Sequence, residues 1–225
     1  MHIITWERGM VIVSEELNFY TKGEEIANAI THGIGVVLAI AGAVLLIVFA
    51  SLSGDVYKIV SFTIFGITLF LLYLGSTLYH SIPNKKVKRF LRIIDHSSIY
   101  LLIAGTYTPY VLVCLRDNKK AMVIFIMIWV LTILGIVFKF ICINKFENLS
   151  TLLYIFMGWA VIFVVKDVWQ RVPHMSVLWL IIGGLFYTLG CIFFVLDRMP
   201  YNHAIWHLFV MGGSISHFFS VILYL

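Results

Sequence analysis

Two histidines, His203 and His207, stand four residues apart in the apolar stretch PYNHAIWHLFV, residues 200–210. Residues four apart on a helix share a face, so both imidazoles can direct a nitrogen at one point. This is the spacing at which H-x-x-x-H motifs bind zinc. A histidine pair that only joins a buried polar network is the alternative, and the spacing alone leaves both open.

A catalytic zinc site takes three protein ligands and leaves its fourth tetrahedral position to water. His80 is the candidate third ligand, because it closes one apolar segment at the membrane face where the segment with His203 and His207 begins. Ser76 lies four residues before His80 on the same face and is placed to hydrogen-bond a ligand or the water. Other metals that bind imidazole, such as nickel and copper, would accept the same residues.

Polar residues of two further segments stand at the same level. Asp95, in RIIDHSSIY, begins an apolar segment, where a carboxylate either caps a helix or orients and deprotonates the water of a metal site. Glu25, Asn28 and His32 are spaced by three and four and form one polar stripe. The stripe is either an ordinary amphipathic helix start or a set of side chains that support the ligands of the same site.

The chain that carries these residues is strongly apolar. Its 225 residues are 61% hydrophobic and 12% charged, with a mean hydropathy of +1.00, against about 45–50% apolar and about 25% charged residues in soluble domains. This composition indicates an integral membrane protein. Its hydrophobic runs are continuous and approach the roughly 20 residues that a membrane helix needs, which favours helices over a β-barrel.

We predict an all-α membrane protein, a seven-transmembrane helix bundle that forms one domain over residues 25–225. The predicted helices cover residues 28–52, 59–81, 94–115, 121–141, 149–166, 175–196 and 203–224. Residues 1–24 are predicted to be a cytoplasmic tail, with an interfacial helix that lies on the membrane through Trp6, Phe19 and Tyr20.

The distribution of Lys and Arg predicts the orientation of the bundle. A cytoplasmic N-terminus and an outside C-terminus put ten of the sixteen Lys and Arg residues on the cytoplasmic side. The loop IPNKKVKRFLR has five positive charges and no acid, so we expect it to contact anionic inner-leaflet lipid. These charges are Lys85, Lys86, Lys88, Arg89 and Arg92. Topology and lipid contact explain the net charge of +5, and nothing indicates a nucleic-acid partner.

Counting the predicted crossings places five of the eight histidines at one membrane face, whichever way the protein is inserted. They are His32, His80, His96, His203 and His207. A single histidine near a helix end is usually an interfacial residue. Ionisable groups within membrane spans are costly, however, and commonly mark a function. The sequence therefore predicts a metal site at this face of the bundle.

Three motifs make the sequence resemble a known family. E-x-x-N-x-x-x-H occurs as EIANAITH, S-x-x-x-H with a following Asp occurs as Ser76, His80 and Asp95, and H-x-x-x-H occurs as HAIWH. In this order they are similar to the motifs of the haemolysin III group of bacterial membrane proteins, which belongs with the progestin and adiponectin receptor family. The resemblance covers the chain from about Glu24 to Leu225.

The resemblance implies a bacterial plasma membrane protein with its N-terminus inside and a zinc near the cytoplasmic face. It implies that His80, His203 and His207 hold the zinc and that Asp95 holds a water. His96 stands where the receptor relatives tend to have a tyrosine, so the resemblance gives it no role. The receptor relatives are associated with ceramide hydrolysis, whereas the bacterial relatives were named for haemolytic activity. A shared family supports a site more strongly than a reaction.

Two functions follow from these observations. In the first, the protein is a zinc-dependent, ceramidase-like hydrolase of a membrane lipid amide or ester, with Asp95 as general base. In the second, the zinc is structural, with Asp95 as its fourth ligand, and the protein is a non-enzymatic membrane-homeostasis, sensor or cytolytic factor. Neither the lipid nor the oligomeric state follows from the sequence. The two functions differ in the fourth ligand, which is water in the first and a carboxylate in the second.

Overall fold

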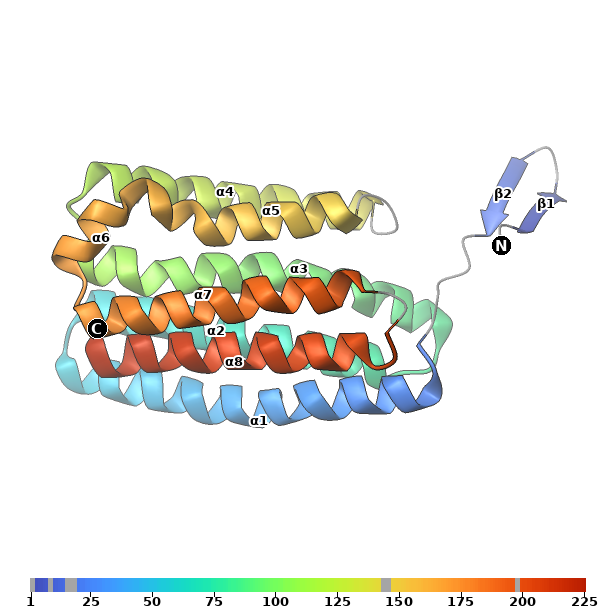
Figure 1. Ribbon diagram of the computed structural model, residues 1–225, viewed down its shortest axis with the longest axis horizontal. Coiled ribbons are helices and arrows are strands. Elements are labelled where there is room, and N and C mark those ends of the chain that lie inside the picture. Colours follow the sequence, from blue (N-terminus) through green and yellow to red (C-terminus); the bar gives the residue numbers. More distant parts are fainter. Residues whose placement is uncertain (1–2, 8–9, 15–19, 143–146, 197–198) are drawn as a thin grey trace.

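The computed structural model describes residues 3–7, 10–14, 20–142, 147–196 and 199–225 (Figure 1). A small antiparallel hairpin of β1 (Ile3–Glu7) and β2 (Met10–Ser14) precedes a bundle of helices. The α-helices are α1 (Lys22–Ser53), α2 (Val56–Ser81), α3 (Lys85–Pro109), α4 (Lys119–Cys142), α5 (Glu147–Trp159), α6 (Val165–Arg171), α7 (His174–Val195) and α8 (Asn202–Tyr224). A π-helical turn η1 (Tyr110–Cys114) follows α3, and a 3-10 turn η2 (Ala160–Val164) joins α5 to α6.

Seven segments of the described residues are long and apolar enough to cross a membrane, which confirms the predicted all-α seven-helix bundle. The third segment combines α3 with η1, and the fifth combines α5, η2 and α6. The fifth runs to Arg171, beyond its predicted end at residue 166, because the 3-10 turn continues the helix instead of ending it. The orientation of the bundle in the membrane stays a prediction.

The predicted interfacial helix does not form at Trp6, which lies in β1. Strand pairing explains the difference, because the alternating residues of Ile3–Glu7 pair in register with Met10–Ser14. Phe19 lies outside the described residues. Tyr20 directly precedes α1, and its ring lies against two histidines of the bundle, as described below.

Neighbouring helices along the chain pack together, and the last helix returns to the first. α1 packs against α2 and α8, α2 against α3, α3 against α4, and α7 against α8. The start of α1 and the end of α8 lie at opposite ends of the bundle, as an odd number of crossings requires (Figure 1). At one end α1, α3 and α8 begin and α2 finishes, and we call this the site end.

Side-chain caps fix where the helices of the site end begin. Thr21 and Glu24 form a capping box at the start of α1, each accepting the other's backbone N–H. The Asn84 side chain accepts the N–H groups of the first turn of α3. Glu24 also accepts the backbone N–H of Tyr201 at 3.1 Å, which ties the start of α8 to the start of α1.

Two irregular turns interrupt the α-helical hydrogen bonding, one after α5 and one after α3. The Tyr107 hydroxyl donates to the carbonyl of Met157 at 2.9 Å and accepts the N–H of Val161 at 2.9 Å, so it satisfies backbone groups where α5 gives way to η2. Pro109 has no N–H to continue the α-helical ladder, and the π-helical turn that follows it accommodates the loss.

Candidate metal centre

The structure brings together the three histidines that the sequence predicts as ligands. His80 comes from the last turn of α2, whereas His203 and His207 come from the first two turns of α8. Their residues are only 4%, 4% and 0% exposed. One ring nitrogen of each lies within 4.8 Å of the others, so a single ion can bind all three.

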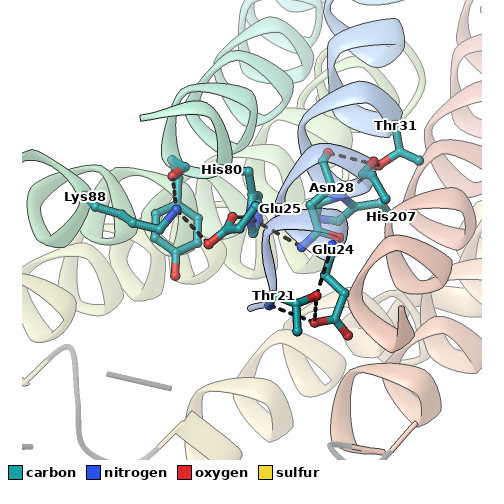
Figure 2. A network of polar contacts seen from close by, with 10 residues as sticks. Thr21, Glu24, Glu25, Asn28, Thr31, His80, Lys88 and His207 are labelled. Atoms are coloured by element: carbon teal, nitrogen blue, oxygen red, sulfur yellow. Dashed lines mark hydrogen bonds and ion pairs between the residues drawn. The ribbon is translucent and has the colours of Figure 1, made fainter. Parts of the chain in front are cut away.

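A carboxylate from α1 fixes the orientation of the His80 ring. Nδ1 of His80 lies 2.7 Å from Oε2 of Glu25 (Figure 2). A carboxylate only accepts hydrogen bonds, so Nδ1 carries the hydrogen and donates it. In a neutral imidazole the other nitrogen, Nε2, then has its lone pair available for a metal.

A hydroxyl from α1 orients the His207 ring in the same way. The Thr31 hydroxyl donates to the backbone carbonyl of Ala27 at 2.9 Å, so its oxygen is free to accept. Nδ1 of His207 lies 3.1 Å from that oxygen, which accepts its hydrogen in the tautomer that is protonated at Nδ1 (Figure 2). In that tautomer Nε2 of His207 presents the lone pair.

One nitrogen of each of the three rings makes no hydrogen bond and suits a metal ion. Nε2 of His80, of His203 and of His207 is buried, and none of them has a hydrogen-bond partner among the described residues. Buried polar atoms are nearly always paired, so unpaired nitrogens on three neighbouring imidazole rings call for an explanation. A ligand set of three neutral imidazoles suits zinc, and it also suits copper and nickel.

Asp95 lies beside this group without belonging to it. Its residue, in α3, is 5% exposed. Among the described residues, the ligand atoms that all lie within 4.8 Å of one another belong to the three histidines, and no oxygen of Asp95 is among them. Ser76 is buried one turn before His80 in α2. The arrangement therefore offers three protein ligands with a carboxylate nearby.

The predicted polar stripe of α1 lines the same group. Glu25 contacts His80 as described above, and the Asn28 amide nitrogen lies 3.4 Å from Nδ1 of the same ring. The His32 ring stacks on the His207 ring with centroids 3.4 Å apart and planes 15° apart. All three residues of the stripe thus touch a histidine of the group, which an ordinary amphipathic helix start would not require.

The structure adds to the prediction for His96 and corrects the prediction for Lys88. His96 borders a small cavity of about 10 Å³ that Asp95, Lys139 and His203 also border, and it is not a member of the three-histidine group. Lys88 was predicted to contact lipid, but it is only 5% exposed and pairs with Glu25 at 2.8 Å. The lipid prediction fails for Lys88 because this residue faces the bundle, and for the other four basic residues of the loop it stays a prediction.

Three residues that contact the site are not predicted as site residues from the sequence. Thr31 follows the stripe residue Asn28 by one turn, so the helical period could have revealed it. Lys88 precedes Asp95 by two turns on one face of α3, which is a similar signal. Tyr20 packs its ring 4.9 Å from that of His203 and 5.6 Å from that of His80, and no sequence pattern predicts this contact.

An apolar cavity of about 380 Å³ extends from the site through the bundle. His32 and Asp95 border it at the site end, and Leu115 and Val177 border it near the opposite end. Ile162 in η2 also borders the cavity and is 60% exposed at the outer surface of the bundle. The cavity is therefore long, almost entirely apolar, and bounded on one side by residues that face the lipid.

A seven-helix membrane bundle with a buried three-histidine group at one end and an apolar cavity behind it defines a class of multi-pass membrane protein with a candidate metal centre. The family described as Haemolysin-III related matches residues 20–218 of the chain. The chain belongs to the haemolysin III family and is a multi-pass protein of the cell membrane.

Relatives from bacteria and mammals match nearly the whole chain. Hemolysin-3 of Bacillus cereus is 49% identical over 201 residues, which are 89% of this chain and 91% of that protein. The Hemolysin-3 homolog of Bacillus subtilis (strain 168) is 49% identical over 205 residues, 91% of this chain and 96% of that protein. The human monocyte to macrophage differentiation factor is 32% identical over 209 residues, 90% of this chain and 84% of that protein.

Proposed function

We propose that this haemolysin III protein is a zinc-dependent hydrolase that cleaves an amide or ester bond of a membrane lipid. The observation that carries the proposal is a buried three-histidine group close to a long apolar cavity, which is bordered by Asp95 and by His32, whose ring stacks on that of His207. A cavity of about 380 Å³ is within the roughly 300–1,000 Å³ typical of small-molecule sites. Its walls suit an acyl chain, and the lipid-facing residue Ile162 marks a side from which a lipid could enter.

Each residue of the site then has a chemical task. His80, His203 and His207 hold zinc, which supplies Lewis-acid activation of a carbonyl and lowers the pKa of a water molecule. The Asp95 carboxylate accepts the proton of the water as the water oxygen adds to the carbonyl carbon. Asp95 returns that proton to the leaving nitrogen or oxygen as the carbon–nitrogen or carbon–oxygen bond breaks. The products are a fatty acid and an amine or alcohol, as in a ceramidase.

The alternative, a structural zinc in a sensor or cytolytic protein, needs a fourth protein ligand. Structural zinc sites are normally closed by four protein side chains. Asp95 was the candidate, and among the described residues it does not join the set of mutually close ligand atoms. Three ligands with a nearby carboxylate support the hydrolase. The name of the Bacillus cereus relative keeps cytolysis as an outcome to be tested.

Metal content tests the site. Full-length protein purified in detergent and washed with a mild chelator should hold about one zinc per chain by elemental analysis, and His80→Ala and His207→Ala should lose it. His217→Ala is the matched control, because His217 is a buried α8 histidine outside the group, and this variant should keep the zinc. A folded wild type without metal would refute the metal centre.

Activity tests the reaction. Wild-type protein and Asp95→Asn are compared on mixed micelles of ceramides and of glycerolipid esters, with release of fatty acid as the readout. Asp95→Asn should keep its zinc and lose about 100-fold or more in rate, the usual contribution of a general base. Equal rates in the two proteins would remove Asp95 from the mechanism. Leakage of dye from protein-treated liposomes without lipid cleavage would favour the cytolytic function.

A further inference from the structure

Lys88 is set apart from the other basic residues of its segment by burial. Lys85, Lys86 and Arg89 are exposed around the first turns of α3, whereas Lys88 is 5% exposed. A buried ammonium is costly unless it is paired and hydrogen-bonded. The burial of Lys88 therefore implies that its partners compensate for the water it has lost.

The partners of Lys88 lie on two other helices. Its Nζ donates to the backbone carbonyl of Tyr79 at 2.9 Å and lies 4.9 Å from the centre of the Tyr79 ring. The same Nζ lies 2.8 Å from Oε1 of Glu25 (Figure 2). Tyr79 immediately precedes His80 in α2, so the ammonium is hydrogen-bonded to the turn of α2 that carries the candidate ligand His80.

The two oxygens of Glu25 divide between Lys88 and His80. Oε1 pairs with the ammonium, and Oε2 accepts from Nδ1 of His80 at 2.7 Å. The Glu25 side chain is 16% exposed, so water can reach it. With one oxygen fixed by Lys88, the carboxylate cannot turn toward water without giving up an ion pair.

We propose that Lys88 is a positioning residue of the metal centre, which acts through Glu25 to hold the His80 ring with Nε2 toward the ion. The inference rests on the proposed metal centre and extends it to a residue that no motif of the family resemblance includes. Partners that orient metal-bound histidines are commonly worth about 10–100-fold in metal affinity. Lys88 acts one residue further out than Glu25, so its loss should weaken zinc binding by about 10-fold, the low end of that range.

Zinc affinity measured by competition with a chromophoric chelator tests this on the full-length protein in detergent. Lys88→Met should bind zinc about 10-fold more weakly, and Lys88→Arg should restore part of the loss because it keeps the charge. Lys86→Met removes the same charge from an exposed position two residues away and should bind as the wild type does. In the cobalt-substituted proteins, the visible absorption bands should change in Lys88→Met and stay unchanged in Lys86→Met.

A double variant separates positioning from simple support of the fold. If Lys88 acts through Glu25, adding Lys88→Met to Glu25→Ala should not weaken zinc binding further. The double variant also leaves no unpaired charge in the buried site, so it guards against misfolding of the single variant. Independent, additive losses, or unchanged affinity in Lys88→Met, would overturn the role of Lys88 while leaving the metal centre intact. A wild type that binds no zinc would overturn both proposals.

Discussion

Replacing Thr31 with valine tests whether a hydrogen bond from α1 orients His207. Valine keeps the shape of threonine and removes the oxygen that lies 3.1 Å from Nδ1 of His207. An unpaired buried N–H costs about 1–3 kcal/mol, and about 1.4 kcal/mol corresponds to a tenfold change in affinity. Thr31 is only half-buried, so a water can replace part of the lost hydrogen bond. We therefore expect zinc affinity to fall by about 10-fold, near the low end of the range for such partners.

The assay is the same chelator competition, with Thr31→Ser as the control. Serine keeps the hydroxyl that donates to the Ala27 carbonyl and accepts from His207, so its zinc affinity should match the wild type. The valine variant should lose affinity without losing the helical circular dichroism of the bundle. Equal zinc affinities in the valine and serine variants would refute the reasoning, and would leave the stacking of His32 on His207 to hold the ring.

Two further predictions concern the bundle itself. Gly105→Ala should lower the free energy of unfolding of the bundle by about 1–3 kcal/mol, because a Cβ there would come within 2.9 Å of Cβ of Thr68 in α2. The assay is unfolding in detergent. Gly158→Ala is the control, because a Cβ at that position meets nothing within 4 Å. In a variant without native cysteines, Lys120→Cys should react with an impermeant maleimide on intact cells and Lys86→Cys should not; the reverse pattern would show that the predicted orientation is wrong.

The number of helices and the three-histidine group followed from simple sequence properties. Length and hydropathy define membrane spans because lipid leaves the backbone no partner except its own helix. His203 and His207 share a face by spacing alone. Counting the crossings predicts that His80 joins this pair, because the end of the second helix and the start of the seventh lie at the same membrane face. These rules depend on the period and length of helices, which tertiary packing does not alter.

Hydropathy does not predict the burial of Lys88, because it places the start of the third helix at residue 94. The structure starts α3 at Lys85, after the Asn84 cap, so the helical period extends through the charged segment. Lys88 then precedes Asp95 by seven residues and lies on the same buried face. A hydropathy criterion excludes charged residues from a membrane span. The charged first turns of α3 are therefore predicted to be a loop, although they are helical.

The E-x-x-N-x-x-x-H motif accompanies the ligand motifs although α1 contributes no ligand to the three-histidine group. α1 packs against both α2 and α8, which carry the three histidines. Glu25 and Thr31 are six residues apart, a rise of about 9 Å and a rotation of about 240°, so one can face α2 while the other faces α8. Each contacts Nδ1 of a different histidine, Glu25 that of His80 at 2.7 Å and Thr31 that of His207 at 3.1 Å. The first helix therefore contacts histidines of two other helices, and a displacement of α1 would disturb both rings at once.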